Sequence, residues 1–391
     1  MKRGNVIVIG NSGVGKSTLI NAVLGEERAG TGWGSEGKTD KLTIYESNEI
    51  PFRIIDTMGF VPSRYGNNKA VKAVKKWASD SAKEGKEDTQ INVIWICIDG
   101  TSRKLFPETI KSLSKATKML KSVPVIVTIT KSYSEPDRKE NIEMVHNAFE
   151  KQKHYSKNLR EVIPVVATTF YLNDHALAPP EGITELIDAT NELMPEGVKA
   201  VKEDINSFKL KRNRALAHGL VGVATTAGAV VGAVPIPFPD ATFLLPLEIG
   251  EVNGIAQIYG IKRDEKSKQL FDSIIQAGSI TVAAKAALNV LKAVPGINLA
   301  ASALNGIVAG AIVAALGEST IYAFEQVYLG KKSIDDIDWI EKVIEARFTS
   351  QFLEAIKSIG EKIPENADMQ SIAKIIMGVF MGNFVNKEVA N

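Results

Sequence analysis

The chain has 391 residues, of which 45% are hydrophobic and 24% are charged. This length predicts two domains rather than one, and the composition excludes a disordered chain. The 47 lysines and arginines nearly balance the 45 aspartates and glutamates, so the formal net charge is only +2. This balance excludes the strongly basic face that an extended nucleic-acid surface needs, and we expect no nucleic-acid partner.

Two features of the N-terminal half bear on where the protein works. The single cysteine, Cys97, lies in an apolar run and has no second cysteine with which to form an internal disulfide. We therefore expect a reducing compartment and a core position for this side chain. A strand is predicted directly after Met1-Lys2-Arg3, which leaves no room for a secretory signal, so we expect a cytoplasmic location.

The first strong pattern is GNSGVGKST at residues 10–18, which matches G-x-x-x-x-G-K-[ST] at every fixed position. A buried strand is predicted at Asn5–Ile9 before it and a helix at Thr18–Leu24 after it, the flanks that a phosphate-binding loop needs. Glycines let backbone N–H groups point at an anion, and the helix dipole adds positive potential at the same place. Lys16 would then reach the β- and γ-phosphates, and the Ser17 hydroxyl would ligate Mg²⁺.

The alternative is a glycine-rich turn that binds nothing. We disfavour it because a lysine at a buried helix start is costly without an anion to neutralise it. The contacts expected from the loop come from Asn11, Ser12, Gly13, Val14, Gly15, Lys16, Ser17 and Thr18.

A second pattern follows some forty residues later. Residues 25–40 contain five glycines and are predicted to form a loop. Strands are predicted at Leu42–Tyr45 and Phe52–Ile55, and the second ends in Asp56-Thr57-Met58-Gly59. A carboxylate at a strand tip can hold Mg²⁺ through water, and the N–H of Gly59 can meet the γ-phosphate.

The rest of the first half alternates between strands and helices. Such alternation predicts an α/β fold, with a mostly parallel sheet covered by helices on both faces. Ligands of such sheets bind at the carboxyl ends of the strands, where the loop, Asp56 and Lys131 would gather. The further strands are predicted at 92–99, 123–130 and 162–167, and the helices at about 69–83, 107–120, 135–151 and 183–194.

Three motifs together resemble those of small GTPases of the Era/Ras-like class within the P-loop fold. GNSGVGKST resembles their phosphate loop, DTMG at 56–59 their Mg²⁺ and γ-phosphate motif, and TITKS at 128–132 their guanine-reading motif. The resemblance covers residues 1 to about 195. It implies a GTP-binding domain with a mostly parallel six-stranded sheet, and GTP or GDP with Mg²⁺ as its ligands.

The resemblance also implies the roles of single residues. Lys16 and Thr39 would be catalytic, with Thr39 closing over Mg²⁺ as the last threonine of the glycine-rich loop, and Thr31 is its rival for that role. The implied metal ligands are Ser17, Thr39 and Asp56. Beyond the phosphate loop, the implied nucleotide contacts are Asp56, Gly59, Thr130, Lys131, Ala167 and Thr168.

Two positions depart from the family pattern. The base-reading motif usually ends in an aspartate, but Thr130-Lys131-Ser132 is followed by Tyr133, so guanine selectivity is weakened or uses a shifted acid such as Glu135 or Asp137. Phe60 stands where relatives often carry a water-orienting glutamine, which predicts slow intrinsic hydrolysis.

Smaller signals refine this prediction. Arg28 and Arg64 are candidates for a charge-stabilising arginine, although each also suits a solvated surface position. Gly13 stands where potassium-stimulated relatives carry asparagine, so we expect no K⁺ requirement.

The composition changes after residue 195. Residues 196–214 predict a basic connecting helix, for which a solvated role and a lipid-facing role both stay open. Residues 215–239 and 293–317 then contain no Asp, Glu, Lys or Arg. Their small-x-x-x-small spacings, at Gly228/Gly232 and Gly306/Gly310, predict close helix packing. A compact helical bundle and insertion into or association with a membrane both remain open.

Residues 215–330 resemble the helical family catalogued as domain of unknown function 697. The motifs that carry this resemblance are PIPFPD at 235–240, Leu247-Glu248-Ile249-Gly250 with Ile258-Tyr259-Gly260, and Val294-Pro295-Gly296 with Ala315-Leu316-Gly317. It implies an all-α, Ala/Gly-rich domain of a family found attached to GTPase domains and in membrane-associated proteins. Residues 331–391 predict amphipathic helices that pack on this domain.

The leading hypothesis is a GTP-binding, Mg²⁺-dependent and slow GTPase that acts as a switch on its helical domain. The alternatives are a membrane-interaction protein whose nucleotide domain hydrolyses negligibly, and an ATP-binding protein. The expected partner is a guanine nucleotide. A membrane surface and a second GTP-binding domain in a homodimer are partners that stay open.

Overall fold

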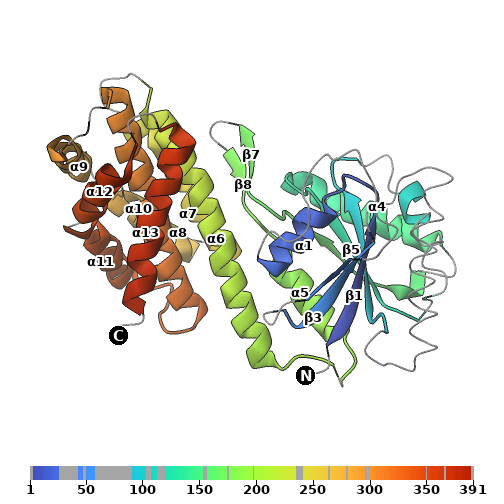
Figure 1. The fold of residues 1–391 in the computed structure, drawn as a ribbon. Helices are drawn as coiled ribbons and strands as arrows, with labels where there is room; N and C mark the ends of the chain where they lie inside the picture. The colour runs from blue at the N-terminus through green and yellow to red at the C-terminus, as the bar shows by residue number, and fades with distance from the viewer. Residues whose placement is uncertain are drawn as a thin grey trace. The chain divides into compact units, whose positions relative to one another are not determined.

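The computed structural model contains one chain, which divides into two compact units (Figure 1). The first consists of Met1–Thr168 and Pro180–Arg212, and the second of Thr169–Pro179 and Asn213–Asn391. The structure describes residues 3–25, 43–46, 50–57, 90–102, 107–111, 120, 122–152, 156–173, 176–196, 198–234, 241–262, 265–278, 281–295, 297, 299–348, 350–364 and 367–388.

The first unit is built on a six-stranded sheet in the order β2-β3-β1-β4-β5-β6. Neighbouring strands are parallel except for the antiparallel pair of β2 and β3. The mostly parallel α/β fold predicted from the alternating pattern is therefore confirmed. The strands are β1 Gly4–Gly10, β2 Thr43–Tyr45, β3 Phe52–Asp56, β4 Val93–Asp99, β5 Val125–Thr130 and β6 Leu159–Pro164.

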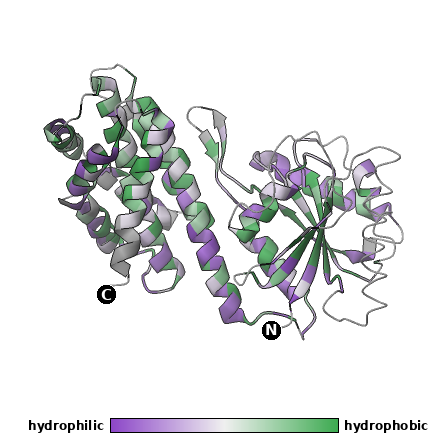
Figure 2. Cartoon of the chain, in the orientation of Figure 1, coloured by the Kyte–Doolittle hydropathy of each residue, from purple (hydrophilic) through white to green (hydrophobic). Residues whose placement is uncertain are grey.

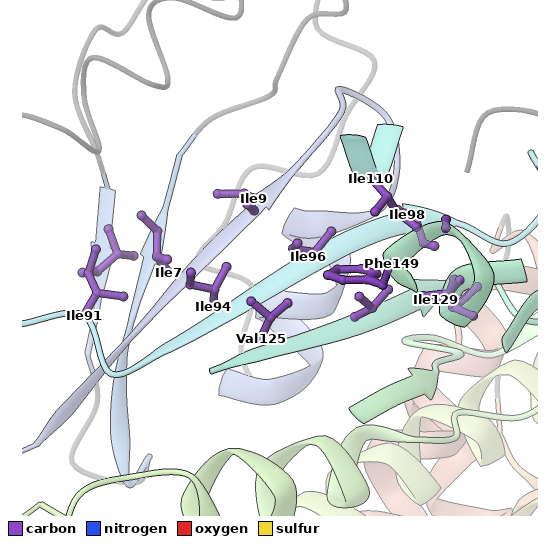
Figure 3. Close-up of a cluster of buried hydrophobic side chains, with 14 residues drawn as sticks. Ile7, Ile9, Ile91, Ile94, Ile96, Ile98, Ile110, Val125, Ile129 and Phe149 are labelled. Atoms are coloured by element: carbon purple, nitrogen blue, oxygen red, sulfur yellow. The ribbon is translucent and has the colours of Figure 1, made fainter. Parts of the chain in front are cut away.

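Helices cover both faces of this sheet, which explains why its strands are continuous apolar runs. On one face, the side chains of alternate residues pack with Phe149 of α4, Glu135–Glu150, in a buried isoleucine-rich core (Figure 3). On the other face, the Trp95 indole N–H donates to the Thr190 hydroxyl of α5, Ile183–Glu192, at 2.9 Å. Cys97 is buried in β4, as predicted.

The strand register brings the site-bearing ends together. Val8 pairs with Asp56 across β1 and β3, Gly10 pairs with Cys97 across β1 and β4, and Asp99 pairs with Thr130 across β4 and β5. Helix α1, Lys16–Leu24, begins just beyond the end of β1. The phosphate-loop pattern therefore lies at the carboxyl edge of the sheet.

Two details of the first half were predicted wrongly. The last strand was expected at 162–167, but β6 ends at Pro164, and Val166 makes only a single bridge to Glu181. The hairpin of β7, Phe170–Asn173, and β8, Ala176–Ala178, was not predicted because strands of three or four residues are too short to show a period. The predicted helix at 69–83 lies outside the described residues, and that at 107–120 is described only at 107–111, which is helical, and at 120, which is not.

The second unit is helical, and α10 lies at its centre. Helix α10 packs against α7, α8, α9, α11 and α13. Its most apolar window is 94% buried, compared with 44% for α6, and these are the two described helices long and apolar enough to cross a membrane. The helices are α6 Lys202–Gly232, α7 Ala241–Ile258, α8 Glu265–Gly278, α9 Thr281–Ala293, α10 Ala301–Tyr328, α11 Ile337–Arg347, α12 Ser350–Lys362 and α13 Met369–Glu388.

Helix α6 differs from the predicted separate connecting helix. It begins at Lys202 and continues without a break to Gly232, so the basic segment and the first apolar run share one helix. Figure 2 shows this change along α6, from hydrophilic in its first half to mostly apolar in its second. No helix breaker stands between the two segments, which is why the composition changes but the backbone does not.

The predicted close helix packing is confirmed. A Cβ atom at Gly232 of α6 would lie 2.9 Å from the Asn305 carbonyl oxygen, and one at Gly306 of α10 would lie 2.7 Å from the Ala229 carbonyl oxygen. The two helix backbones thus approach more closely than any larger residue would allow. The C-terminal amphipathic prediction is also confirmed, because Ile340 and Ile344 of α11 are fully buried.

Candidate functional site

The phosphate loop has the backbone geometry that its glycines predict. Gly13 and Gly15 have φ angles of 78° and 94°, in the left-handed region that other residues rarely adopt. These angles turn the chain from the end of β1 into the first residue of α1, Lys16. The N-terminal N–H groups of α1 and the positive end of its dipole therefore lie at the loop.

Lys16 is 6% exposed, and its ammonium group donates to the carbonyl oxygens of Gly10 at 3.1 Å and Asn11 at 2.9 Å. Burial lowers the pKa of Lys16, while the nearby Cys97 and Asp56 oppose that shift. A buried ammonium held by neutral carbonyl oxygens would gain from an anion at this point. The loop thus has the charge and geometry to bind phosphate.

Asp56 is the buried carboxylate opposite this loop. It ends β3, and the next residue, Thr57, donates from its hydroxyl to the Val8 carbonyl oxygen at 2.9 Å. Ser17, half-buried, follows Lys16 in the first turn of α1. A hydroxyl and a carboxylate suit Mg²⁺, which prefers oxygen ligands and takes one or two from the protein and others from phosphates and water. Ser17 and Asp56 therefore have the oxygen groups that a Mg²⁺ site needs.

The base side of the site is formed by the end of β5. Thr130 donates from its hydroxyl to the carbonyl oxygens of Val14 and Ile98, the latter at 2.9 Å. Lys131, with a φ of 55°, donates from its ammonium to the Gly13 carbonyl oxygen at 2.9 Å. Thr130 and Lys131, the two predicted base contacts, thus form hydrogen bonds to the backbone of the phosphate loop.

Asp99, at the tip of β4, is a site residue that sequence reasoning missed. Its Oδ2 accepts from the Lys131 ammonium at 2.6 Å, and its Oδ1 accepts from the Thr101 hydroxyl at 2.6 Å and N–H at 2.9 Å. Burial raises the pKa of this carboxyl, but the hydrogen bonds from Lys131 and Thr101 outweigh burial and lower it overall. A carboxylate at a strand tip was the signal used for Asp56, and it would have found Asp99 as well.

Tyr133, which replaces the family aspartate, lies within the field of Asp99. Burial raises the pKa of the Tyr133 hydroxyl, and the negative charge of Asp99 raises it further. The phenol therefore stays neutral at physiological pH. Asp99, Lys131 and Tyr133 together give this end of the site one carboxylate, one ammonium and one aromatic ring.

The segment after β6 forms backbone hydrogen bonds with the end of β5, at the carboxyl edge of the sheet. The Val165 N–H donates to the Ile129 carbonyl oxygen at 2.8 Å, and the Ser132 N–H donates to the Val165 carbonyl oxygen at 3.2 Å. Ala167 and Thr168 follow directly, the first half-buried and the second exposed. Thr39 and Gly59 lie outside the described residues, as do Phe60, Thr31, Arg28 and Arg64.

Comparison with known families agrees with this geometry. Residues 5–131 match the family described as 50S ribosome-binding GTPase, and residues 198–347 match the domain of unknown function DUF697. The chain is a P-loop GTPase domain joined to a DUF697 helical domain. Both resemblances inferred from the motifs are thereby confirmed.

Single relatives match parts of the chain. Translocase of chloroplast 34 from Arabidopsis thaliana is 36% identical over 73 residues, 18% of this chain and 23% of that protein. Neuronal-specific septin-3 of Mus musculus is 26% identical over 192 residues, 41% of this chain and 55% of septin-3. GTPase Der of Neisseria meningitidis is 43% identical over 89 residues, 22% of this chain and 17% of Der. The chain thus spans between about a fifth and just over half the length of these relatives.

Among solved structures, Toc33 from Arabidopsis thaliana in complex with Mg²⁺ and GMPPNP aligns with a TM-score of 0.38 and 15% identity. The alignment covers 49% of this chain and 85% of Toc33. A TM-score this low adds nothing to what the family matches establish. The GTPase domain of this chain is therefore assigned from its sequence family and its site geometry.

Proposed function

We propose that the protein binds GTP and GDP with Mg²⁺, hydrolyses GTP slowly, and uses the nucleotide state as a switch on its DUF697 domain. The observation that carries this proposal is the buried Lys16 at the start of α1, whose ammonium group donates to the carbonyl oxygens of Gly10 and Asn11 and lies near Asp56. That arrangement has a clear use in binding a polyphosphate with its metal ion.

Each residue of the site has a proposed role. Lys16 and the loop amides from Asn11 to Thr18 would hold the phosphates, while Ser17 and Thr39 would ligate Mg²⁺ and Asp56 would hold it through water. The metal ion, when bound, neutralises charge on the β- and γ-phosphates. Gly59 meets the γ-phosphate through its N–H. The base end is formed by Thr130, Lys131, Ala167 and Thr168.

The low rate follows from the side chain at position 60. A phenylalanine has no hydrogen-bonding group with which to orient water, so Phe60 supplies none of the help that a glutamine would give. Loss of the γ-phosphate would release the loop at 30–38 and the segment after Gly59. In this proposal, residues 1–195 form the GTPase domain, 196–214 the connector, 215–330 the helical effector and 331–391 its C-terminal helices.

Guanine is the proposed base because the GTPase family match supports it. The usual aspartate is replaced by Tyr133, so the discrimination against adenine is expected to be weaker than with a carboxylate that accepts two hydrogen bonds from guanine. Competition between ATP and GTP for the site measures this directly.

Membrane association is a second candidate role for the helical domain. It is favoured by the exposed apolar surface of α6, where Val230 is 52% exposed and Val234, two residues beyond the helix end, is 46% exposed. The burial of α10 instead favours a compact bundle, in which any lipid contact is made at the surface.

The decisive experiment compares the wild-type chain with Lys16→Ala. Binding of a fluorescent GTP analogue and release of phosphate are measured with and without Mg²⁺. Lys16→Ala should lower affinity at least about a hundredfold, because the buried phosphate-binding charge is lost. The matched control is Lys139→Ala, an exposed lysine on α4 that should leave both measurements unchanged.

Two outcomes would count against the proposal. Micromolar GTP affinity retained in Lys16→Ala would remove the phosphate-loop assignment. Phosphate release no faster than without protein, both alone and with anionic liposomes, would reduce the GTPase domain to a nucleotide binder.

A further inference from the structure

Among its described residues, the core of the helical unit contains four buried carboxyl side chains. They come from two helices that pack against each other, α7 and α10. All four are at most 3% exposed, and they are Glu248 and Glu251 of α7 and Glu318 and Glu325 of α10. Buried carboxylates are stable only when they are paired, hydrogen-bonded or neutralised by a proton.

The two glutamates of α10 have partners on α6. Glu325 forms a bidentate ion pair with the Arg214 guanidinium, whose Nε donates at 3.1 Å. Oε1 of Glu318 lies 2.8 Å from Nδ1 of His218. Both partners, Arg214 and His218, belong to α6.

Glu251 is fully buried, and neither of its carboxyl oxygens has a hydrogen-bond partner among the residues that the structure describes. Its Oε1 would lie only 2.4 Å from a Cβ atom at Gly317 of α10, and the same Cβ would lie 2.5 Å from Val221 of α6. The carboxyl group therefore points at the bare backbone of α10, where three helices converge. In the described parts of these helices, no side chain donates a hydrogen bond to it.

The ionisable groups around Glu251 are mostly acids. Glu248 lies one turn earlier on its own helix, and Glu318 faces it from α10. Tyr171 of β7 is also near, but its hydroxyl donates to the Val223 carbonyl oxygen at 2.7 Å. From α6, His218 faces Glu318, and Arg214 faces Glu325.

The other two elements that pack on α7 add no buried charge in their described parts. Strand β8 consists of Ala-Leu-Ala, and the described charged side chains of α8, Lys268 and Asp272, are exposed. Among all described residues, no group of three or more histidine, cysteine or acidic side chains could hold a metal ion. A proton needs no such set of ligands, and it neutralises a buried carboxylate directly.

The electrostatics agree with this geometry. Burial, followed by repulsion from Glu248 and Glu318, raises the pKa of Glu251 well above its usual value. Burial also raises the pKa of Glu248 to about 7. The negative charge of Glu251 in turn contributes, after burial, to raising the pKa of Tyr171 to about 12.

We propose that the core between α6, α7 and α10 is a proton-binding site, in which Glu251 holds a proton at neutral pH and loss of that proton loosens α7 from α10. The proton passes to water when Glu251 ionises, and the carboxylate left behind faces Glu248 and Glu318. The site does not depend on nucleotide binding, so it stands or falls apart from the proposed GTPase activity.

The sign of the pH dependence follows from linkage. Above pH 4.5, the usual pKa of a glutamate, the unfolded chain loses this proton while the folded chain keeps it. The folded state therefore binds more protons, and stability falls as pH rises. For one such site, the unfolding equilibrium constant rises by up to about tenfold per pH unit until the pKa of the folded state is reached.

The test compares the full chain with Glu251→Gln, a neutral side chain of nearly the same shape. Hydrogen exchange of α7 and α10 is measured from pH 5 to pH 8.5 and corrected for intrinsic rates. In the wild type, the opening constant of these helices should rise with pH by at least about tenfold beyond that of the variant. Glu345→Gln, at an exposed glutamate of α11, is the matched control and should behave like the wild type.

A second measurement reports the protonation state of Glu251 directly, so it stays informative even if Glu251→Gln alters stability for other reasons. The infrared difference spectrum between wild type and Glu251→Gln at pH 7 should contain the carbonyl stretch of a protonated carboxyl group. Absence of that band would overturn the proposal, because it would mean that Glu251 is ionised. So would stabilisation of the wild type, and not of the variant, by Mg²⁺ or Ca²⁺ alone, which would make the occupant a metal ion.

Discussion

Each of the two units buries an ionisable side chain that its fold leaves incompletely neutralised, but the surroundings differ. Lys16 is bonded to two carbonyl oxygens and lies near Asp56, so a charged state is supported at the edge of the sheet. Glu251 has no hydrogen-bond partner among the described residues and lies near two other acids. The first environment is suited to an added anion and the second to an added proton.

The largest effect is expected where a buried charge already has its partner. Arg214→Gln would leave Glu325, whose side chain is 4% exposed, facing an amide instead of a guanidinium. We expect the helical unit to lose about 3 kcal/mol of unfolding free energy, since an unpaired buried charge remains. Urea denaturation followed by circular dichroism at pH 7 measures this loss.

The matched control for this prediction is the double variant Arg214→Gln/Glu325→Gln, in which no charge is left behind. It should recover at least half of the lost stability. A loss below about 0.5 kcal/mol in the single variant would show that water reaches Glu325 and that the pair behaves like a surface salt bridge.

A smaller effect is expected from filling the space beside Glu251. In Gly317→Ala, the new methyl group would lie within 2.5 Å of both the Glu251 carboxyl and Val221, so α10 must shift. We expect a loss of about 2 kcal/mol, as for other overpacked cores. The measurement is again urea denaturation of the full chain.

Gly378→Ala on α13 provides the control, because a Cβ there meets no atom within 4 Å. That change should stabilise the helix by about 0.5 to 1 kcal/mol, since alanine loses less backbone entropy than glycine. Equal effects at both glycines would refute the close approach at Gly317.

The smallest effect is expected at the base end of the GTPase site. Asp99→Asn removes the negative charge that pairs with the Lys131 ammonium while keeping the side-chain shape. The affinity for GDP should fall about tenfold, because Lys131 is held less firmly at the base end of the site. Fluorescence titration with a labelled GDP analogue measures the change.

The control ligand for this variant is inorganic tripolyphosphate, which distinguishes loss of Lys131 positioning from damage to the whole site. It occupies only the phosphate loop, so its affinity should be the same in Asp99→Asn and the wild type. A parallel loss for tripolyphosphate and GDP would mean that Asp99 supports the whole loop rather than the base end.

The sequence alone determined the phosphate loop and the α/β fold because both are local signals. Residues 10–18 carry their meaning in the spacing of glycines, Lys16 and Ser17, and buried parallel strands appear as apolar runs whatever their neighbours. The apolar character of the helical unit and its close glycine contacts were evident for the same reason.

Tertiary structure alone decided which distant residues meet. Asp99 joins the site only because β4 pairs with β5, which places its carboxylate within reach of Lys131. The partners of Glu318 and Glu325 are 100 and 111 residues away in the chain, and Glu251 is isolated only because three helices converge on it. Whether a buried charge is paired depends on packing between elements, and no local pattern of residues records that.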